Sequence, residues 1–161
     1  AAYSAGLGQG AELEVCLPIT SAPGAQQQEP GKKETSCRRM LIVEDNADAA
    51  QMLCKLLASE GHEVTMTTNG PEALEILREN DIDIVLCDIG LPGMSGYELA
   101  QTVRTDSSLQ QPMLVAVTGY GQPEDRRKTA KAGFDDHLVK PVDSDTLNAV
   151  LNRLDIEDEH E

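Results

Sequence analysis

Apolar segments typical of strands alternate with amphipathic segments typical of helices five times between residues 38 and 154. The apolar runs lie at about 39–44, 63–67, 82–87, 113–118 and 134–139. Segments typical of helices lie at about 47–59, 71–79, 95–104, 123–132 and from 144 onward; 123–132 is polar, whereas the others carry apolar residues at helical spacing. Strict alternation of this kind predicts an α/β fold with a doubly wound parallel sheet and helices on both faces.

Polar residues stand where four of these apolar runs end. Glu44 and Asp45 come after the first run, Asp88 after the third, Thr118 after the fourth and Lys140 after the fifth. The carboxyl ends of parallel strands meet at one edge of the sheet, which is where ligands bind in this class of fold. We therefore expect these five side chains to form one site.

Three clustered carboxylates repel one another unless a cation lies among them. Hard divalent cations prefer oxygen ligands, so the acids predict a metal site. An aspartate can also act as a nucleophile that forms an acyl phosphate, and a lysine and a hydroxyl could stabilise its oxygens. Taken singly, Glu44 and Asp45 could instead cap a helix, Asp88 could be a turn residue, and Thr118 and Lys140 could be ordinary strand and surface residues.

Four stretches of the chain carry a resemblance to a known family. LIVEDN at 41–46, VLCDIGLPGMSGYELA at 85–100, AVTGY at 116–120 and DHLVKPV at 136–142 resemble the receiver domain of two-component response regulators. The resemblance covers 38–154. It implies a flavodoxin-like (βα)5 fold with strand order 2-1-3-4-5, and a phosphoacceptor, Asp88, that takes a phosphoryl group from a phosphohistidine.

The same resemblance implies a metal site. Asp45, Asp88 and the backbone carbonyl of Gly90 would bind Mg²⁺ or Mn²⁺, and Glu44 would assist directly or through water. Such a domain promotes its own phosphorylation and dephosphorylation.

Two residues are implied to form the conformational switch. Thr118, together with Lys140, would bind the phosphoryl oxygens and move inward, and so would an aromatic residue on the fifth strand. That position is His137, where the family more often has Tyr or Phe, so the ring could also be a partly exposed side chain without this role, a metal ligand or a phosphodonor. The face built from the fourth and fifth βα units would carry the signal, and a cis bond before Pro141 would direct Lys140 into the site.

The remaining segments suggest a longer parent protein. Residues 1–20, with a glycine run before an alternating strand that ends Leu-Pro, resemble the end of a histidine-kinase ATPase domain. Residues 21–37 are expected to be a flexible linker and 155–161 an acidic solvated tail. The parent is therefore expected to be a hybrid sensor kinase, whose catalytic domains this chain lacks. Its partners would be a histidine kinase, within the same parent or separate, or a histidine phosphotransfer protein.

Composition excludes several other functions. The net charge of −15 disfavours nucleic-acid binding, which needs a positive surface. No apolar run reaches the roughly 18 residues of a membrane span, so no membrane contact is expected from this fragment, and its expected location is the cytoplasm, with a parent that could be membrane-anchored. The four cysteines lack metal or redox spacing.

Two other classes of function fit the same fold. An aspartate-nucleophile phosphatase of the haloacid-dehalogenase type would need a second Asp two residues after Asp88, where this chain has Gly90. A binding module of the flavodoxin type would need neither the three acids nor Lys140.

Overall fold

The apolar runs form a five-stranded parallel sheet. The structure, a computed structural model, describes residues 2–3, 12–13, 37–119 and 123–157. Its elements after residue 37 are β3 (Arg39–Val43), α1 (Ala47–Ser59), β4 (Glu63–Thr67), α2 (Gly70–Glu79), β5 (Ile84–Asp88), α3 (Gly96–Thr105), β6 (Met113–Thr118), α4 (Pro123–Ala132), β7 (Asp136–Val139) and α5 (Ser144–Glu157).

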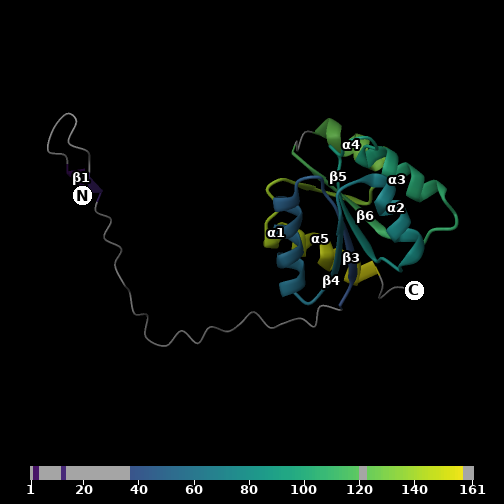
Figure 1. The fold of residues 1–161 in the computed structure, drawn as a ribbon, viewed down its shortest axis with the longest axis horizontal. Coiled ribbons are helices and arrows are strands. Elements are labelled where there is room, and N and C mark those ends of the chain that lie inside the picture. The colour runs from purple at the N-terminus through teal and green to yellow at the C-terminus, as the bar shows by residue number, and fades with distance from the viewer. Residues whose placement is uncertain (1, 4–11, 14–36, 120–122, 158–161) are drawn as a thin grey trace. The chain divides into compact units, whose positions relative to one another are not determined.

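The strand order is β4-β3-β5-β6-β7, and all neighbours are parallel. Numbered along the domain, this is the order 2-1-3-4-5, which confirms the predicted fold. The order reverses between β3 and β5, so the helices that follow these two strands lie on opposite faces (Figure 1). In folds of this class, ligands bind where the strand order reverses, which here is at the carboxyl ends of β3 and β5.

Successive residues of the three central strands, β3, β5 and β6, contribute to two separate cores. Met40 and Ile42 pack with α1 and α5, whereas Leu41 and Val43 pack with α2, α3 and the end of α4. Because both faces are covered there, these strands are nearly continuous apolar runs, whereas the edge strands β4 and β7 also carry polar and exposed residues. Phe134 is the one aromatic residue among the buried members of the two cores.

Local signals set the ends of the helices. Asn46, Asn69 and Ser95 cap the amino ends of α1, α2 and α3, and Ser95 forms a capping box with Glu98. The last helix continues to Glu157 and so includes the first three residues of the expected acidic tail, because no Gly or Pro interrupts the sequence there.

The chain divides into two units, and within the first, residues 1–33, β1 (Ala2–Tyr3) pairs antiparallel with β2 (Glu12–Leu13). Most of the expected ATPase remnant, and the linker at 21–37 apart from Cys37, lie outside the described residues. None of the helices in the described ranges combines the length and apolarity that crossing a bilayer requires.

Candidate functional site

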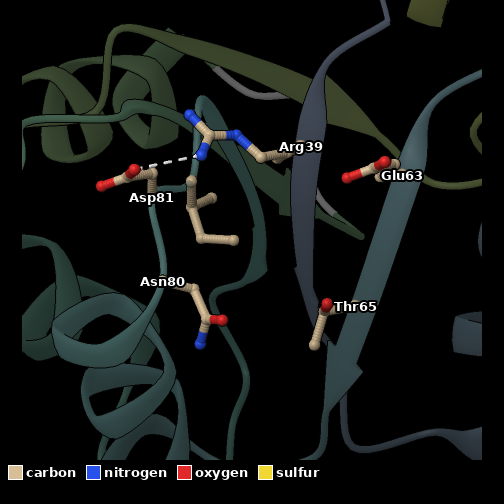
Figure 2. Close-up of a pocket in the computed structure, with 6 residues that line it drawn as sticks. Arg39, Glu63, Thr65, Asn80 and Asp81 are labelled. Atoms are coloured by element: carbon tan, nitrogen blue, oxygen red, sulfur yellow. Dashed lines mark ion pairs between the residues drawn. The ribbon is translucent and has the colours of Figure 1, made fainter.

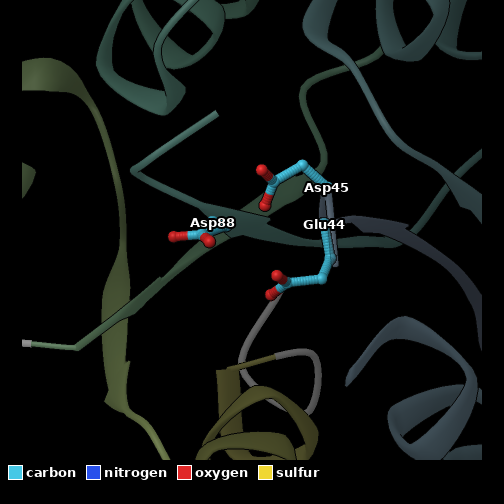
Figure 3. Close-up of side chains that lie close together, drawn as sticks. All are labelled: Glu44, Asp45 and Asp88. Carbon is cyan, nitrogen blue, oxygen red and sulfur yellow. The ribbon is translucent and has the colours of Figure 1, made fainter. Parts of the chain in front are cut away.

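Three carboxylates converge at the carboxyl edge of the two central strands. Glu44 and Asp45 follow β3, and Asp88 is the last residue of β5. These strands are hydrogen-bonded neighbours, with Val43 opposite Cys87. One oxygen of each acid lies within 4.8 Å of the others, and Figure 3 shows the three side chains directed into a common space. The acids expected to cluster from the sequence therefore do so.

Lys140 brings a positive charge into this cluster. Its Nζ donates to Asp88 Oδ2 at 2.7 Å and lies 2.6 Å from Glu44 Oε2. Its backbone N–H donates to the carbonyl of Thr118 at 2.8 Å, and the Lys140–Pro141 bond is cis. Burial lowers the pKa of Lys140, but the bonds to Asp88 and Glu44 outweigh burial, and its pKa lies above the ordinary value.

Glu44 is the buried member of the cluster, with 4% of its surface exposed. Its Oε1 accepts from the backbone N–H of Asn46 at 3.3 Å, while its Oε2 faces Lys140. The alternative that Glu44 and Asp45 cap α1 is not what the structure shows, because the cap is Asn46, whose side chain accepts from Asp48 and Ala49. Asn46 therefore both starts α1 and orients Glu44. Its capping role, though not its contact with Glu44, could have been inferred from its position before a helical segment.

The backbone around Asp88 is tightly packed. Its Oδ1 accepts from the N–H of Gly90 at 3.0 Å, so the carboxylate makes a turn contact as well as the lysine contact. A Cβ at Gly96 would lie 2.5 Å from the Asp88 carbonyl oxygen, so only glycine fits at the start of α3. Cys87 donates its thiol to that same carbonyl, and burial, followed by the charges of Asp88 and Glu44, raises the pKa of this thiol.

The two expected switch residues lie on the neighbouring strands. Thr118 is buried and ends β6, one residue beyond Val117, the register partner of Asp88. His137 lies opposite Ala116, two register positions before Thr118, with 13% of its side chain exposed. Burial lowers the pKa of His137, and the charge of Arg126 lowers it further. Tyr120, two residues after Thr118, lies outside the described residues.

The donor set fits a hard divalent cation. All three side chains offer carboxylate oxygens, which Mg²⁺ prefers, and their charge exceeds what one lysine can neutralise. Both carboxylate oxygens of Glu44 and of Asp88 already have partners, so the exposed Asp45 is the most available ligand. Asp88, which is half-buried, is more open to a cation than the buried Glu44.

A hollow lies at the other end of the strands, away from Asp88. Its volume is about 150 Å³, and it is lined by Arg39, Glu63, Thr65, Asn80, Asp81 and Ile82 (Figure 2). Arg39 pairs with Asp81 and with Asp83, both at 3.2 Å, so its charge is already compensated. Among the described residues, the acids that converge closely enough to hold a cation are Glu44, Asp45 and Asp88, and not the acids of this hollow.

Comparisons with known proteins agree with this geometry. A family model, the response regulator receiver domain, matches residues 40–152. The cell cycle response regulator CtrA of Brucella ovis is 35% identical over 116 residues, which are 72% of this chain and 49% of that protein. The sensor histidine kinase AtsR of Burkholderia thailandensis is 32% identical over 154 residues, which are 92% of this chain and 26% of the kinase. This chain thus spans about half of CtrA and about a quarter of AtsR.

Solved structures match over the same region. The chemotaxis response regulator CheY4 of Vibrio cholerae superposes with a TM-score of 0.69 and 28% identity, over 74% of this chain and 99% of that one. The receiver domain of the sensor histidine kinase PA1611 of Pseudomonas aeruginosa, crystallised with magnesium in its active-site cleft, has a TM-score of 0.67 and 28% identity, over 73% of this chain and 97% of that one.

Proposed function

The chain belongs to the response regulator receiver family of two-component systems, and from that premise we propose that Asp88 is its phosphoacceptor. The single observation that carries the proposal is the position of the Asp88 carboxylate. It lies at the carboxyl edge of the sheet, beside two further acids and 2.7 Å from the Lys140 ammonium. A nucleophilic carboxylate needs this combination of charge compensation and access.

The reaction is a phosphoryl transfer from a phosphohistidine. An oxygen of Asp88 forms a bond to phosphorus, the bond from phosphorus to the imidazole nitrogen breaks, and that nitrogen keeps the electron pair. Lys140 and Thr118 donate to the phosphoryl oxygens, which fixes the transferred group and offsets its charge. This is electrostatic positioning by groups that the sheet edge already holds in place.

Asp45, Asp88 and the backbone carbonyl of Gly90 would hold Mg²⁺, with Glu44 assisting. When bound, the cation supplies charge neutralisation that lets two anionic groups approach each other. The magnesium in the PA1611 receiver supports this assignment.

The output of the proposed reaction passes through Thr118 and His137. Both lie on strands at the end of the sheet that α4 and α5 cover, and Lys140 is bonded through its backbone to Thr118. A phosphoryl group that draws Thr118 inward would open space beside β7 for the His137 ring. The message would then reach the face formed by α4, β7 and α5.

The phosphodonor is a histidine kinase, which we propose to be part of the same parent protein. The match to AtsR supports a hybrid parent, because it covers 92% of this chain and so extends beyond the receiver segment. A histidine phosphotransfer protein would be the partner if the signal passes along a relay.

Acetyl phosphate tests the phosphoacceptor assignment directly. The full chain is incubated with Mg²⁺ and acetyl phosphate, and intact mass is measured. We expect a gain of about 80 Da, the mass of one phosphoryl group on a carboxylate, in the native chain and none in Asp88→Asn. The matched control is Asp48→Asn, an exposed aspartate in α1, which should be labelled like the native chain. An unlabelled native chain, or equal labelling of Asp88→Asn, would refute the assignment.

A further inference from the structure

A groove runs between α3 and α4, on helices that do not contribute to the acid cluster. Its volume is about 260 Å³, and it is lined by Tyr97 and Gln101 of α3 and by Lys128, Lys131 and Ala132 of α4. Tyr97 is half-buried and Ala132 is buried, whereas both lysines are exposed. The groove therefore combines an apolar wall with two ammonium groups at its rim.

The positive charge of α4 is unusual in this chain. Only 13 basic residues accompany 28 acidic ones, and four of the 13 lie in α4: Arg126, Arg127, Lys128 and Lys131. All four are exposed, and none forms an ion pair with a described side chain.

Most basic residues of the domain outside α4 are in ion pairs. Five of them form ion pairs with aspartate or glutamate: Arg39, Arg78, Arg104, Lys140 and Arg153. In α4, by contrast, Lys128 and Lys131 form no ion pair with a described side chain, so these two ammonium groups at the rim of the groove remain available to an external anionic partner.

We propose that the α3–α4 groove is a docking surface for an acidic helical segment of a partner protein. Lys128 and Lys131 are about one helical turn apart, so carboxylates three or four residues apart on the partner would match them. An apolar side chain between those carboxylates would pack against Tyr97 and Ala132. The surface contains neither Asp88 nor its neighbours, so the proposal does not depend on phosphorylation.

Two other occupants fit the charges less well. A second copy of this chain carries the same net charge of −15, and the two fields would repel over most of their surfaces. The same field opposes the phosphate backbone of a nucleic acid. A locally acidic helix needs only a small complementary patch, which α4 provides.

The probe for this surface is an alanine-based helical peptide with two glutamates four positions apart and one leucine between them. We expect the peptide to shift the backbone amide signals of α3 and α4 in ¹H–¹⁵N spectra of the full chain, centred on Gln101 and Lys128. The version with glutamines in place of the glutamates should bind at least about tenfold more weakly at low salt, because the attraction is electrostatic. Equal binding of both peptides, or shifts centred elsewhere, would overturn the proposal.

Charge reversals on α4 localise the effect. The double variant Lys128→Glu, Lys131→Glu should bind the acidic peptide at least about tenfold more weakly. The control is Arg127→Glu, an exposed position of the same helix outside the groove lining, which should bind within about threefold of native. If all variants lose affinity in proportion to charge, or if the double variant binds normally, the groove is not the docking surface. Amide spectra of the variants alone check that the fold is retained.

Two further measurements test a second copy of the chain and the acidic end of this chain as alternative occupants. If the same amide signals shift with protein concentration before any peptide is added, the groove binds a second copy. If the triple variant Asp158→Asn, Glu159→Gln, Glu161→Gln shifts these signals in the absence of peptide, the groove binds the acidic end of this chain. Either result overturns the proposal, and invariance in both supports it.

Discussion

Lys140 and Asp88 are 52 residues apart in the sequence, yet the lysine Nζ lies 2.7 Å from Asp88 Oδ2. The same ammonium lies 2.6 Å from Glu44 Oε2, so one cation bridges the buried and the half-buried acid. The raised pKa of Lys140 keeps this bridge charged at neutral pH. The acceptor carboxylate is therefore held in one orientation before any phosphodonor arrives.

Removing the Lys140 charge should slow phosphorylation of Asp88. We expect Lys140→Met to reduce the rate of labelling by acetyl phosphate by roughly tenfold or more, since a hydrogen bond to a charged group contributes about 1.5–3 kcal/mol. Time-resolved intact mass measures the rate. Lys140→Arg keeps the charge and should fall between native and Lys140→Met. The contribution assigned to Lys140 would be disproved by a Met variant that is labelled at the native rate.

The three acids should contribute unequally to Mg²⁺ binding. Asp45→Asn should weaken binding by at least about tenfold, because it removes an exposed ligand that has no competing partner among the described residues. Glu44→Gln should weaken it less, because Lys140 and Asn46 already engage both Glu44 oxygens. Isothermal titration of the full chain measures both affinities. A larger loss in Glu44→Gln would show that Glu44 is the principal ligand instead.

Gly96→Ala should destabilise the domain. The added Cβ would lie 2.5 Å from the Asp88 carbonyl and 2.9 Å from the Ile89 Cα, and neither backbone atom can move freely. Overpacking of this kind costs roughly 1–3 kcal/mol of unfolding free energy. Gly119→Ala is the control, since a Cβ there has nothing within 4 Å. Urea denaturation measures the stability of both variants. Equal denaturation midpoints for Gly96→Ala and Gly119→Ala would contradict the predicted clash.

Asp83 should make stability depend on pH at the acidic end. Burial raises the pKa of Asp83, but the backbone N–H of Arg39, at 2.7 Å, and its guanidinium outweigh burial and hold that pKa below the ordinary value. An aspartate with a depressed folded pKa adds stability above its unfolded pKa, and this contribution is lost as pH falls through the folded value. We expect it to disappear progressively below about pH 4.

Asp83→Asn tests this pH dependence. Unfolding free energies of both chains are compared by urea denaturation across pH 2.5–7, a range chosen to bracket about pH 4. The difference between native and variant should shrink as the pH falls. A difference that stays constant would mean that the Asp83 charge does not contribute.

The His137 ring should be neutral at pH 7. Its pKa is lowered, chiefly by burial and then by the charges of Arg126 and Arg153, whereas Asp136 opposes the shift. NMR titration of the ring should give a pKa below that of the same histidine in the urea-unfolded chain. Arg126→Gln should raise the folded value, because it removes a repelling cation. If the pKa of His137 in the folded chain were equal to or above its pKa in the unfolded chain, burial would not be the main influence on this ring.

Much of the fold and of the site could be predicted from local pattern. The βα alternation predicts a parallel sheet, and the polar residues after the apolar runs predict which side chains share its edge. Asp45, Asp88 and Lys140 were predictable because a residue that ends a parallel strand has little freedom in where it lies. Asn46 was not predicted as a partner of Glu44, because its backbone contact depends on how the chain turns from β3 into α1.

The sequence by itself determined the order of elements, the aliphatic core and the set of polar residues at the carboxyl edge, because each depends on periodicity along the chain. Only the tertiary structure decided that Lys140 bridges Glu44 and Asp88, that Gly96 packs on the Asp88 carbonyl and that α3 and α4 leave a groove with a cationic rim. These features are distances between elements far apart in sequence, and they depend on how the helices pack across the sheet, which periodicity does not encode.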